Sequence, residues 1–374
     1  MRIQFLTRSL GCGGAERQLV LMAKALARTH QVEVVTFYSG DNHFASDQAL
    51  APLLHSLDKR GRWDVMPFLT RFVRHVRQTR PDVVYAFMGP ASLVALTARL
   101  AAPGTRVVWG IRSSNMALDQ YDWLAARLRR LECRLSRFAH LLISNSQAGR
   151  DQALADGFAN HRILVIDNGI DTSMFRRLPG AHAALVQRLG LPAGTPLVGT
   201  MARIDPMKGY EVFLQAAERL HQAMPQVHFV AGGAGAANYT ATLRAQARSR
   251  GLDRHVHWLG QVDDVSALYS AVDLYTSASV FGEGFSNAVG EAMACGAPCV
   301  VTDVGDAARI VGETGLVVPA GDAPRLADAW RQLLDLPADA RLARGARAQQ
   351  RVVEHFSVDA LVRATESSLA GAQQ

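Results

Sequence analysis

Short apolar runs alternate along the chain with amphipathic segments whose apolar positions recur at helical spacing. The first pair is a strand at 2–7 and a helix in which Leu19, Met22 and Leu26 share one face. The same alternation continues through strands at 32–37, 83–87, 107–111, 141–144 and 163–166, and it begins again at residue 197. This order of strand, helix and strand predicts α/β domains built on parallel sheets.

The length of 374 residues is sufficient for two such domains. Between the two series of strands lies the sequence DNGID at 167–171, in which Asn-Gly favours a tight turn. We therefore predict an N-terminal domain at 1–172, a C-terminal domain at 173–357 and a final helix at 358–374.

Charge is unevenly shared between the two halves. Residues 1–170 carry 22 Lys and Arg against 13 Asp and Glu, whereas the rest of the chain carries 18 against 20. Much of the excess lies at 71–80 and 127–137, where apolar residues are interleaved at helical spacing. Such helices can rest on an anionic membrane surface or can simply expose a solvated basic face, and both interpretations stay open.

Several classes of protein are disfavoured by what the sequence lacks. It has no apolar run of eighteen residues and no signal peptide, and its four cysteines show no metal-ligand spacing, so we expect a cytoplasmic protein. The glycines at 11–14 lack the spacing of a nicotinamide-binding loop, which argues against an oxidoreductase. No lysine lies in the context expected of a pyridoxal-dependent sugar phosphorylase.

The segment SVFGEGFSNAVGEAMACGAPCV at 279–300 carries the most specific pattern. A Gly-rich turn at 281–285 leads into a helix at 286–295. Unpaired N–H groups at a helix start suit an anion such as phosphate, whereas the carboxylate of Glu283 on the same turn suits hydroxyl groups. Glu291 lies two turns further along the helix. The segment thus predicts a site for a ligand that combines phosphate with sugar hydroxyls.

The same segment closely resembles the donor-site signature of the family 4 retaining glycosyltransferases of the GT-B fold. In that signature two glutamates, here Glu283 and Glu291, are separated by seven residues and followed by E-A-M-A-x-G-x-P, here 291–298. The resemblance implies two Rossmann-like domains that face each other across a cleft, and a final helix that crosses back to the N-terminal domain. It also implies that Glu291 binds ribose hydroxyls and Glu283 the hydroxyls of the sugar.

Other stretches extend the resemblance. Arg203 and Lys208 lie in an A-R-x-x-x-x-K-G run, in which the two cations hold the diphosphate as it gains charge. The N-G-I-D sequence resembles the family's domain junction, and Gly13 and Gly14 resemble its G-G-A-E opening, which faces the diphosphate. The other residues expected to contact the donor, mainly through backbone groups, are Gly233, Leu259, Phe285, Ser286 and Asn287.

Arg112 departs from the family pattern, because many members have a histidine near this position. It follows the strand at 107–111 and precedes Ser113, Ser114 and Asn115. Strand ends of open α/β sheets collect ligands, so we expect Arg112 at the cleft, as a cation for a phosphate or an acidic acceptor. A surface arginine is the alternative. The sequence at 285–287, where many relatives have Gly and Pro, suggests altered sugar selectivity.

The resemblance implies a retaining enzyme in which the departing phosphate accepts the proton of the acceptor. The cleft residues include no Asp-x-Asp motif, so we expect neither metal nor other cofactor. Expected partners are a nucleotide sugar, UDP-linked in our first hypothesis, and a glycan or polyprenyl-diphosphate-linked acceptor in surface-polysaccharide or lipopolysaccharide synthesis, with no nucleic acid. The alternatives are a soluble small-molecule acceptor and a non-catalytic glycan- or lipid-binding protein.

Overall fold

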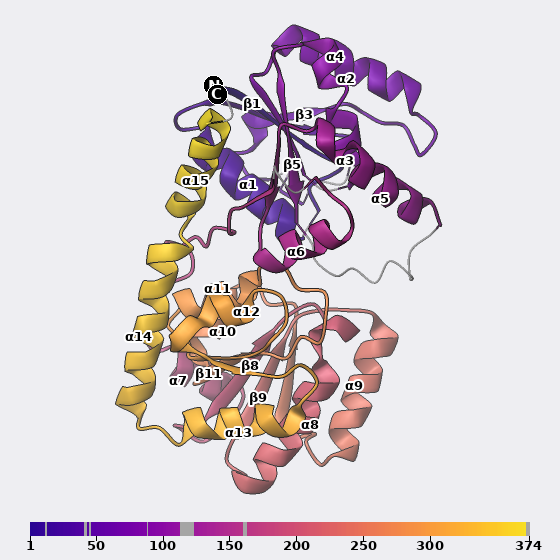
Figure 1. Ribbon diagram of the computed structural model, residues 1–374. Coiled ribbons are helices and arrows are strands. Elements are labelled where there is room, and N and C mark those ends of the chain that lie inside the picture. Colours follow the sequence, from indigo (N-terminus) through magenta and orange to yellow (C-terminus); the bar gives the residue numbers. More distant parts are fainter. Residues whose placement is uncertain are drawn as a thin grey trace. The chain divides into compact units, whose positions relative to one another are not determined.

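The computed structural model describes residues 1–11, 13–40, 43–44, 46–87, 89–112, 123–159 and 163–371. The chain forms two compact units, each with its own parallel sheet and packed helices (Figure 1). Unit 1 comprises Met1–Gly169 and the C-terminal segment from Val358, and unit 2 comprises Ile170–Ser357. The predicted fold class, two Rossmann-like α/β domains, is confirmed.

Unit 1 has a seven-stranded sheet in the order β3-β2-β1-β4-β5-β6-β7. Its central strands are buried because helices cover both faces of the sheet, which explains the apolar sequence of strands such as the one at Val83–Phe87. Its strands are β1 Arg2–Thr7, β2 Gln31–Thr36, β3 Leu54–Ser56, β4 Val83–Phe87, β5 Arg106–Ile111, β6 Leu141–Ser144 and β7 Ile163–Val165.

The helices of unit 1 bury an apolar face and expose a polar one. They are α1 Gly14–Leu26, α2 Met66–Thr79, α3 Gly89–Ala95, α4 Ala98–Ala101, α5 Trp123–Leu135, α6 Gln147–Ala155 and α15 Val358–Gly371, with 3-10 turns η1 Ala51–Leu53 and η3 Ser136–Phe138. In α2 the buried residues include Phe68, Phe72 and Val76, so the apolar face of this basic helix is used by the core. The second predicted basic helix, at 127–137, corresponds to α5 followed by η3.

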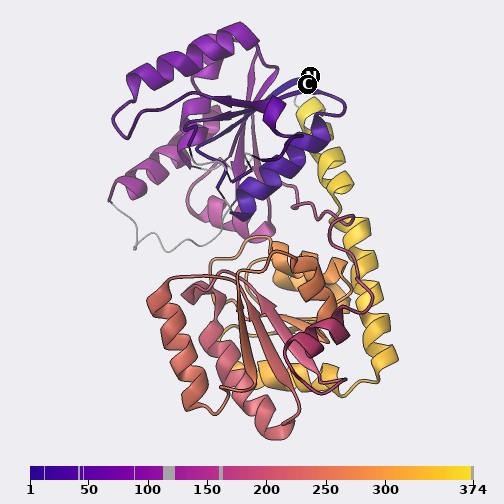
Figure 2. The same cartoon turned by 180° about the vertical axis from the view of Figure 1, so that it is seen from behind.

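The junction sequence is fixed within unit 1 by two hydrogen bonds. The side-chain amide of Gln18 on α1 donates to the carbonyl of Gly169 at 2.8 Å and accepts from its N–H at 3.0 Å. A side chain at position 169 would lie 3.0 Å from the Cα of Val358, so glycine allows α15 to approach. Helix α15 packs beside α1 (Figure 2).

Unit 2 has a six-stranded parallel sheet in the order β10-β9-β8-β11-β12-β13. Its strands are β8 Leu197–Met201, β9 His228–Gly232, β10 Val256–Gly260, β11 Leu274–Ser277, β12 Cys299–Thr302 and β13 Leu316–Val318. Its helices are α7 Ala181–Arg188, α8 Tyr210–Ala223, α9 Ala237–Ser249, α10 Val265–Ala271, α11 Asn287–Ala294, α12 Ala307–Val311, α13 Ala323–Leu334 and α14 Ala338–His355, with 3-10 turns η5 Pro206–Lys208 and η6 Gly312–Thr314.

The two cysteines placed in the predicted core, Cys295 and Cys299, are buried as expected. Burial raises the pKa of the Cys295 thiol to about 11 and that of the Cys299 thiol further. Both thiols therefore stay protonated at neutral pH and act as small apolar groups. In the described part of the chain, no helix is both long and apolar enough to cross a membrane.

Candidate donor-binding site

The candidate site lies in unit 2, where the loops after three neighbouring strands are joined by backbone hydrogen bonds. The order β9-β8-β11 places the carboxyl ends of these parallel strands at one edge of the sheet. Ile204, after β8, donates to Ala234, after β9, at 2.9 Å. Val280, after β11, donates to the carbonyl of Met207 at 2.9 Å. The three loops therefore form one connected platform.

Two glycines allow these loops to approach each other. Gly209 has φ +65°, and a Cβ there would lie 1.9 Å from the carbonyl oxygen of Ala278. Gly233 has φ +130°, and its Cβ would lie 1.8 Å from the carbonyl oxygen of Ala202. Both positions thus require glycine for conformation and for space. For Gly233 this packing role stands beside its predicted contact with the donor.

Lys208 and Glu283, both predicted site residues, form an ion pair in this platform. Ser279 donates a hydrogen bond to the same carboxylate oxygen of Glu283 at 2.8 Å. Thr302 in turn donates to the carbonyl of Ser279 at 2.6 Å, which holds the serine in place. The ion pair is largely shielded from solvent, so the positions of the cation and the carboxylate depend on each other.

Glu291 is buried in α11, with 4% of the residue exposed. The hydroxyl of Tyr269 on α10 donates to its Oε2 at 3.2 Å. The neighbouring Tyr275 has a pKa well above the usual range because of burial, so its hydroxyl remains a donor, here to the carbonyl of Met201 at 3.3 Å. The hydroxyl of Tyr269 thus contacts the carboxylate to which the family resemblance assigns ribose binding.

Helix α11 begins within the same platform. Ser286, the residue before it, has extended backbone and makes no capping hydrogen bond with its side chain. The first N–H groups of a helix have no acceptor inside it, so this end suits an anion. Phe285 packs on the ring of Phe356 with centroids 5.5 Å apart, which anchors the loop. The predicted backbone donors of Phe285, Ser286 and Asn287 therefore lie at a helix start, as expected.

The side chains of Arg203 and Lys208 pair with different carboxylates, although the sequence placed the two cations together. The Arg203 side chain is 66% exposed, and its guanidinium lies 3.4 Å from Asp205 and 3.8 Å from the sulfur of Met207. Arg203 is therefore the exposed cation of this loop, and Lys208 the shielded one.

Leu259 lies at an irregularity of β10, between two residues that pair with β9, and the carbonyl of the following Gly260 accepts from Gly233 at 2.7 Å.

Arg112, in unit 1, is buried rather than exposed at the strand end. It donates to the Tyr85 hydroxyl at 2.7 Å and to the Asn168 side chain at 3.3 Å, and its guanidinium carbon lies 4.3 Å from the centroid of the Phe87 ring. The alternative of a surface arginine is wrong, because 9% of the residue is exposed. The neighbouring Ser113, Ser114 and Asn115 lie outside the described residues.

Gly13 and Gly14, also in unit 1, stand at the start of α1. Gly13 precedes the helix with extended backbone, and a Cβ at this position would lie 2.2 Å from the Glu16 carboxylate. An acidic side chain in the first turn is favourable, since it faces unpaired N–H groups. A phosphate at this helix start would have to share it with the Glu16 carboxylate.

Sequence reasoning missed the residues that hold the two glutamates. Ser279, Thr302 and Tyr269 were not among the predicted site residues, although Ser279 lies four positions before Glu283. A hydroxyl residue close to the predicted turn was a usable signal for Ser279. Tyr269 and Thr302 come from other elements of unit 2, and their sequence positions do not indicate the contact.

Two family models match the chain. The model described as Glycosyltransferase Family 4 matches residues 12–174, and the model described as Glycosyl transferases group 1 matches residues 195–336. The second match contains the whole candidate platform, including both glutamates and both predicted cations.

Relatives in other organisms carry related names. The chain is 35% identical over 193 residues to a phosphatidyl-myo-inositol mannosyltransferase of Mycobacterium leprae, covering 50% of this chain and 48% of that protein. It is 32% identical over 200 residues to the lipopolysaccharide core biosynthesis mannosyltransferase LpcC of Rhizobium leguminosarum, covering 52% and 56%. These alignments span about half the length of the relatives.

A solved structure matches the fold over nearly the whole chain. Anabaena HepE in complex with UDP is 26% identical, with a TM-score of 0.86 and coverage of 99% of this chain and 100% of HepE. HepE has also been solved with UDP-glucose, and that structure matches with a TM-score of 0.84 at 25% identity and similar coverage. With the two family models and the geometry of unit 2, these matches show that the chain belongs to the group 1 glycosyltransferases of family 4 and has the GT-B fold.

Proposed function

We propose that the protein is a retaining glycosyltransferase that binds a UDP-linked hexose or N-acetylhexosamine on unit 2. The observation that carries this proposal is the shielded Lys208–Glu283 ion pair on the platform where α11 begins. A cation and a helix start suit a diphosphate, and a carboxylate beside them suits the hydroxyls of a sugar. A protein that only binds glycans has no need of this combination.

The comparisons support the donor class and the kind of acceptor. HepE was solved with UDP and with UDP-glucose, which favours a uridine nucleotide here. Relatives named as mannosyltransferases of phosphatidyl-myo-inositol and of lipopolysaccharide core favour a glycan or lipid-linked acceptor for surface-glycan synthesis. An acceptor in solution is the second candidate.

In the proposed reaction the bond between the anomeric carbon and the diphosphate breaks, and a bond to the acceptor oxygen forms on the same face of the sugar. The acceptor's proton passes to the departing phosphate oxygen. Lys208 has three N–H donors, so it can keep Glu283 and still bind phosphate. Arg203 can swing in from Asp205 as charge develops. These groups take the part of a metal ion, so we propose transfer without metal.

Calorimetric titration of the whole chain with UDP, GDP and ADP, with chelator present, tests the site. We expect UDP to bind, and Lys208→Ala and Glu291→Gln to weaken that binding at least tenfold. A matched control is Lys24→Ala, which removes the ion pair with Asp47 in unit 1. Tighter binding of GDP would replace the uridine assignment. Absence of binding by all three would overturn the function in favour of a non-catalytic binding protein.

Retention of the anomeric configuration and independence of metal are tested by measuring the reaction itself. The proton NMR spectrum of the first product formed reports the configuration at its anomeric carbon, and we expect it to match that of the donor. Added chelator should leave the rate unchanged. An inverted product, or a rate that chelator abolishes and a divalent ion restores, would contradict this part of the proposal.

We further propose that unit 1 contacts an anionic membrane through α2 and the loop before it. Arg74, Arg77 and Arg80 are exposed, because the apolar face of α2 packs inward. Immediately before and at the start of this helix, Trp63 is 86% exposed and Met66 is 72% exposed. Exposed apolar side chains beside arginines suit the interface of an anionic bilayer.

Flotation of the protein with liposomes tests this contact. We expect binding to vesicles that contain anionic phospholipid, and a loss in the double variants Arg74→Glu, Arg77→Glu and Trp63→Ser, Met66→Ser. The control, Arg244→Glu, Arg248→Glu, changes two arginines on α9 of unit 2. Equal flotation with neutral vesicles would contradict an electrostatic contact. No flotation at all would favour the soluble acceptor.

A further inference from the structure

A cluster of one carboxylate and two imidazoles lies in unit 1, separate from the donor-binding residues of unit 2. Glu33 belongs to β2, His55 to β3 and His75 to α2. In the parallel register Gln4 on β1 is opposite Glu33, and His55 is opposite Val35. Alternate positions of a strand share a face, so Gln4, Glu33 and His55 point to the same side of the sheet.

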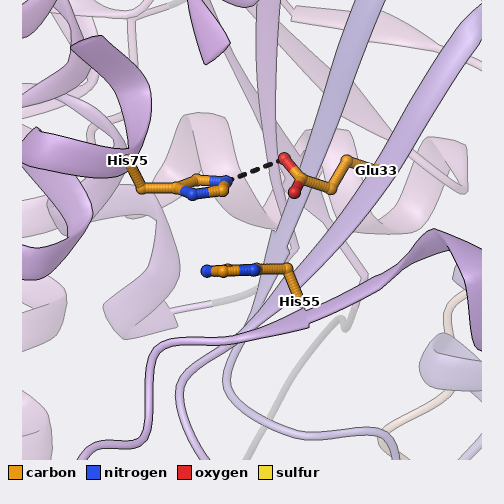
Figure 3. A group of neighbouring side chains, drawn as sticks. All are labelled: Glu33, His55 and His75. Carbon is orange, nitrogen blue, oxygen red and sulfur yellow. Dashed lines mark hydrogen bonds and ion pairs between the residues drawn. The ribbon is translucent and has the colours of Figure 1, made fainter. Parts of the chain in front are cut away.

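The side chains of this cluster are in direct contact (Figure 3). The Nε2 of His75 lies 2.8 Å from Oε2 of Glu33, and the side-chain N–H of Gln4 donates to the same oxygen at 2.8 Å. The ring of His55 stacks on that of His75 with centroids 4.0 Å apart and an interplanar angle of 15°. One ligand atom from each of Glu33, His55 and His75 lies within 4.8 Å of the other two.

Helix α2 covers this face of the sheet with an apolar layer, so a polar side chain here costs folding free energy unless it is paired. Phe72 and Val76 of α2 pack in the same core cluster as Val35. Val76 follows His75 in the chain, and Val35 is paired with His55 in the sheet. Gln4 is 1% exposed, and its amide oxygen has no hydrogen-bond partner among the described residues. Burying such groups without full pairing costs free energy.

We propose that Glu33, His55 and His75 form a binding site for a divalent transition-metal ion, with zinc as the first candidate. Two imidazoles and a carboxylate are a ligand set that zinc uses when a fourth position holds water. Gln4 would hold the carboxylate from behind, as supporting partners of metal ligands do. A water molecule on the ion is also the kind of donor that the Gln4 amide oxygen lacks.

Metal binding requires a small rearrangement. Zinc–ligand bonds of about 2.1 Å place tetrahedral ligand atoms about 3.4 Å apart, so the cluster must contract. A metal ion lies in the plane of each imidazole it binds, so the stacked rings cannot both bind one ion as they lie. His55 is partly exposed on a three-residue strand and can turn. The bound ion would then join β2, β3 and α2 and stabilise unit 1.

Calorimetric titration of the untagged, chelator-stripped full chain with zinc chloride tests this site, and visible absorption of bound cobalt reports its geometry. We expect one ion per chain and a higher thermal midpoint. His55→Ala and Glu33→Gln should each weaken the binding at least tenfold. His228→Ala is the matched control, because His228 contacts His257 in a separate histidine cluster of unit 2.

Circular dichroism in the absence of metal shows whether each variant is folded. We expect Glu33→Gln to fold, since it preserves the size of the side chain and a hydrogen-bond acceptor for Gln4. The proposal is overturned if the wild type binds no zinc, if it has several weak sites that His55→Ala does not affect, or if only His228→Ala loses zinc binding. UDP binding is measured on the same samples. Its persistence after the loss of zinc binding would separate this site from the proposed donor site.

Discussion

At the scale of single residues, the ion pair of Lys208 with Glu283 links two roles that the sequence assigned separately. A cation for phosphate and a carboxylate for sugar hydroxyls hold each other, and Ser279 adds a second hydrogen bond to the carboxylate. Removing either partner leaves the other shielded from water without its counter-charge. Each side chain therefore positions the other, in addition to any contact that it makes with a ligand.

Kinetics of single and double variants check this coupling. We expect Lys208→Ala to lower kcat/KM for the donor about 100-fold, as the loss of one fixed group that stabilises developing charge does in other enzymes. Glu283→Gln should lower it as well, and the double variant should fall by less than the product of the single effects. Independent, multiplicative losses would show that the ion pair has no functional coupling. Thermal unfolding of each variant identifies any loss of folded protein.

At the scale of elements, the close approach of the loops after β8 and β11 depends on Gly209. We expect Gly209→Ala to lower the free energy of unfolding by about 2–4 kcal/mol, because backbone strain of about 1 kcal/mol adds to overpacking against Ala278 of about 1–3 kcal/mol. Gly251→Ala separates the two terms, since its φ is +73° but nothing lies within 4 Å of the added Cβ. Urea midpoints that agree for both variants would rule out the collision.

The same substitution has a second readout at the site. Because Gly209 precedes α8 and follows Lys208, a displaced loop should weaken UDP binding, whereas Gly251→Ala at the end of α9 should leave it unchanged. Calorimetric titration of UDP measures both variants. Normal UDP affinity in Gly209→Ala would show that the platform tolerates the shift.

The elements also show what the sequence could and could not predict. The bounds of β1 and β4 were predicted correctly. In β4, burial on both faces leaves an uninterrupted apolar run, VVYAF, which is a clear signal. Strand β3 was missed, since three residues, LHS, are too short for a period. Spacing along the chain predicted Glu283 and Glu291. It could not show that Lys208, 75 positions before Glu283, reaches the same carboxylate, because that contact depends on how two loops meet.

Arg112 shows the same limit for a single side chain. Its place after β5 was predictable, but its direction was not. The guanidinium turns inward because Tyr85 and Asn168, far away in the sequence, offer it hydrogen-bond acceptors, and the Phe87 ring covers it. The contribution of Arg112 to acceptor binding stays a prediction.

At the scale of the whole chain, a second histidine cluster, in unit 2, should make stability depend on pH. The Nδ1 of His228 lies 2.9 Å from Nε2 of His257, and the rings of His255 and His228 have centroids 4.8 Å apart. Burial, followed by the neighbouring histidines, lowers the pKa of His228 to about 4 from 6.5. The pKa values of His255 and His257 are lowered too, again mainly by burial.

The sign of the effect follows from which state of the chain, folded or unfolded, binds the proton. Between pH 6.5 and about 4 the unfolded chain protonates His228 while the folded chain does not, so the free energy of unfolding falls as the pH falls. We expect urea midpoints to drop from pH 7.5 to pH 5, and the drop to be smaller in His228→Gln. His43→Gln, which changes an exposed histidine of unit 1, should follow the wild type. Gln at position 228 cannot take up a proton on unfolding. Parallel plots of urea midpoint against pH for the wild type and His228→Gln would therefore mean that other groups set the stability in acid.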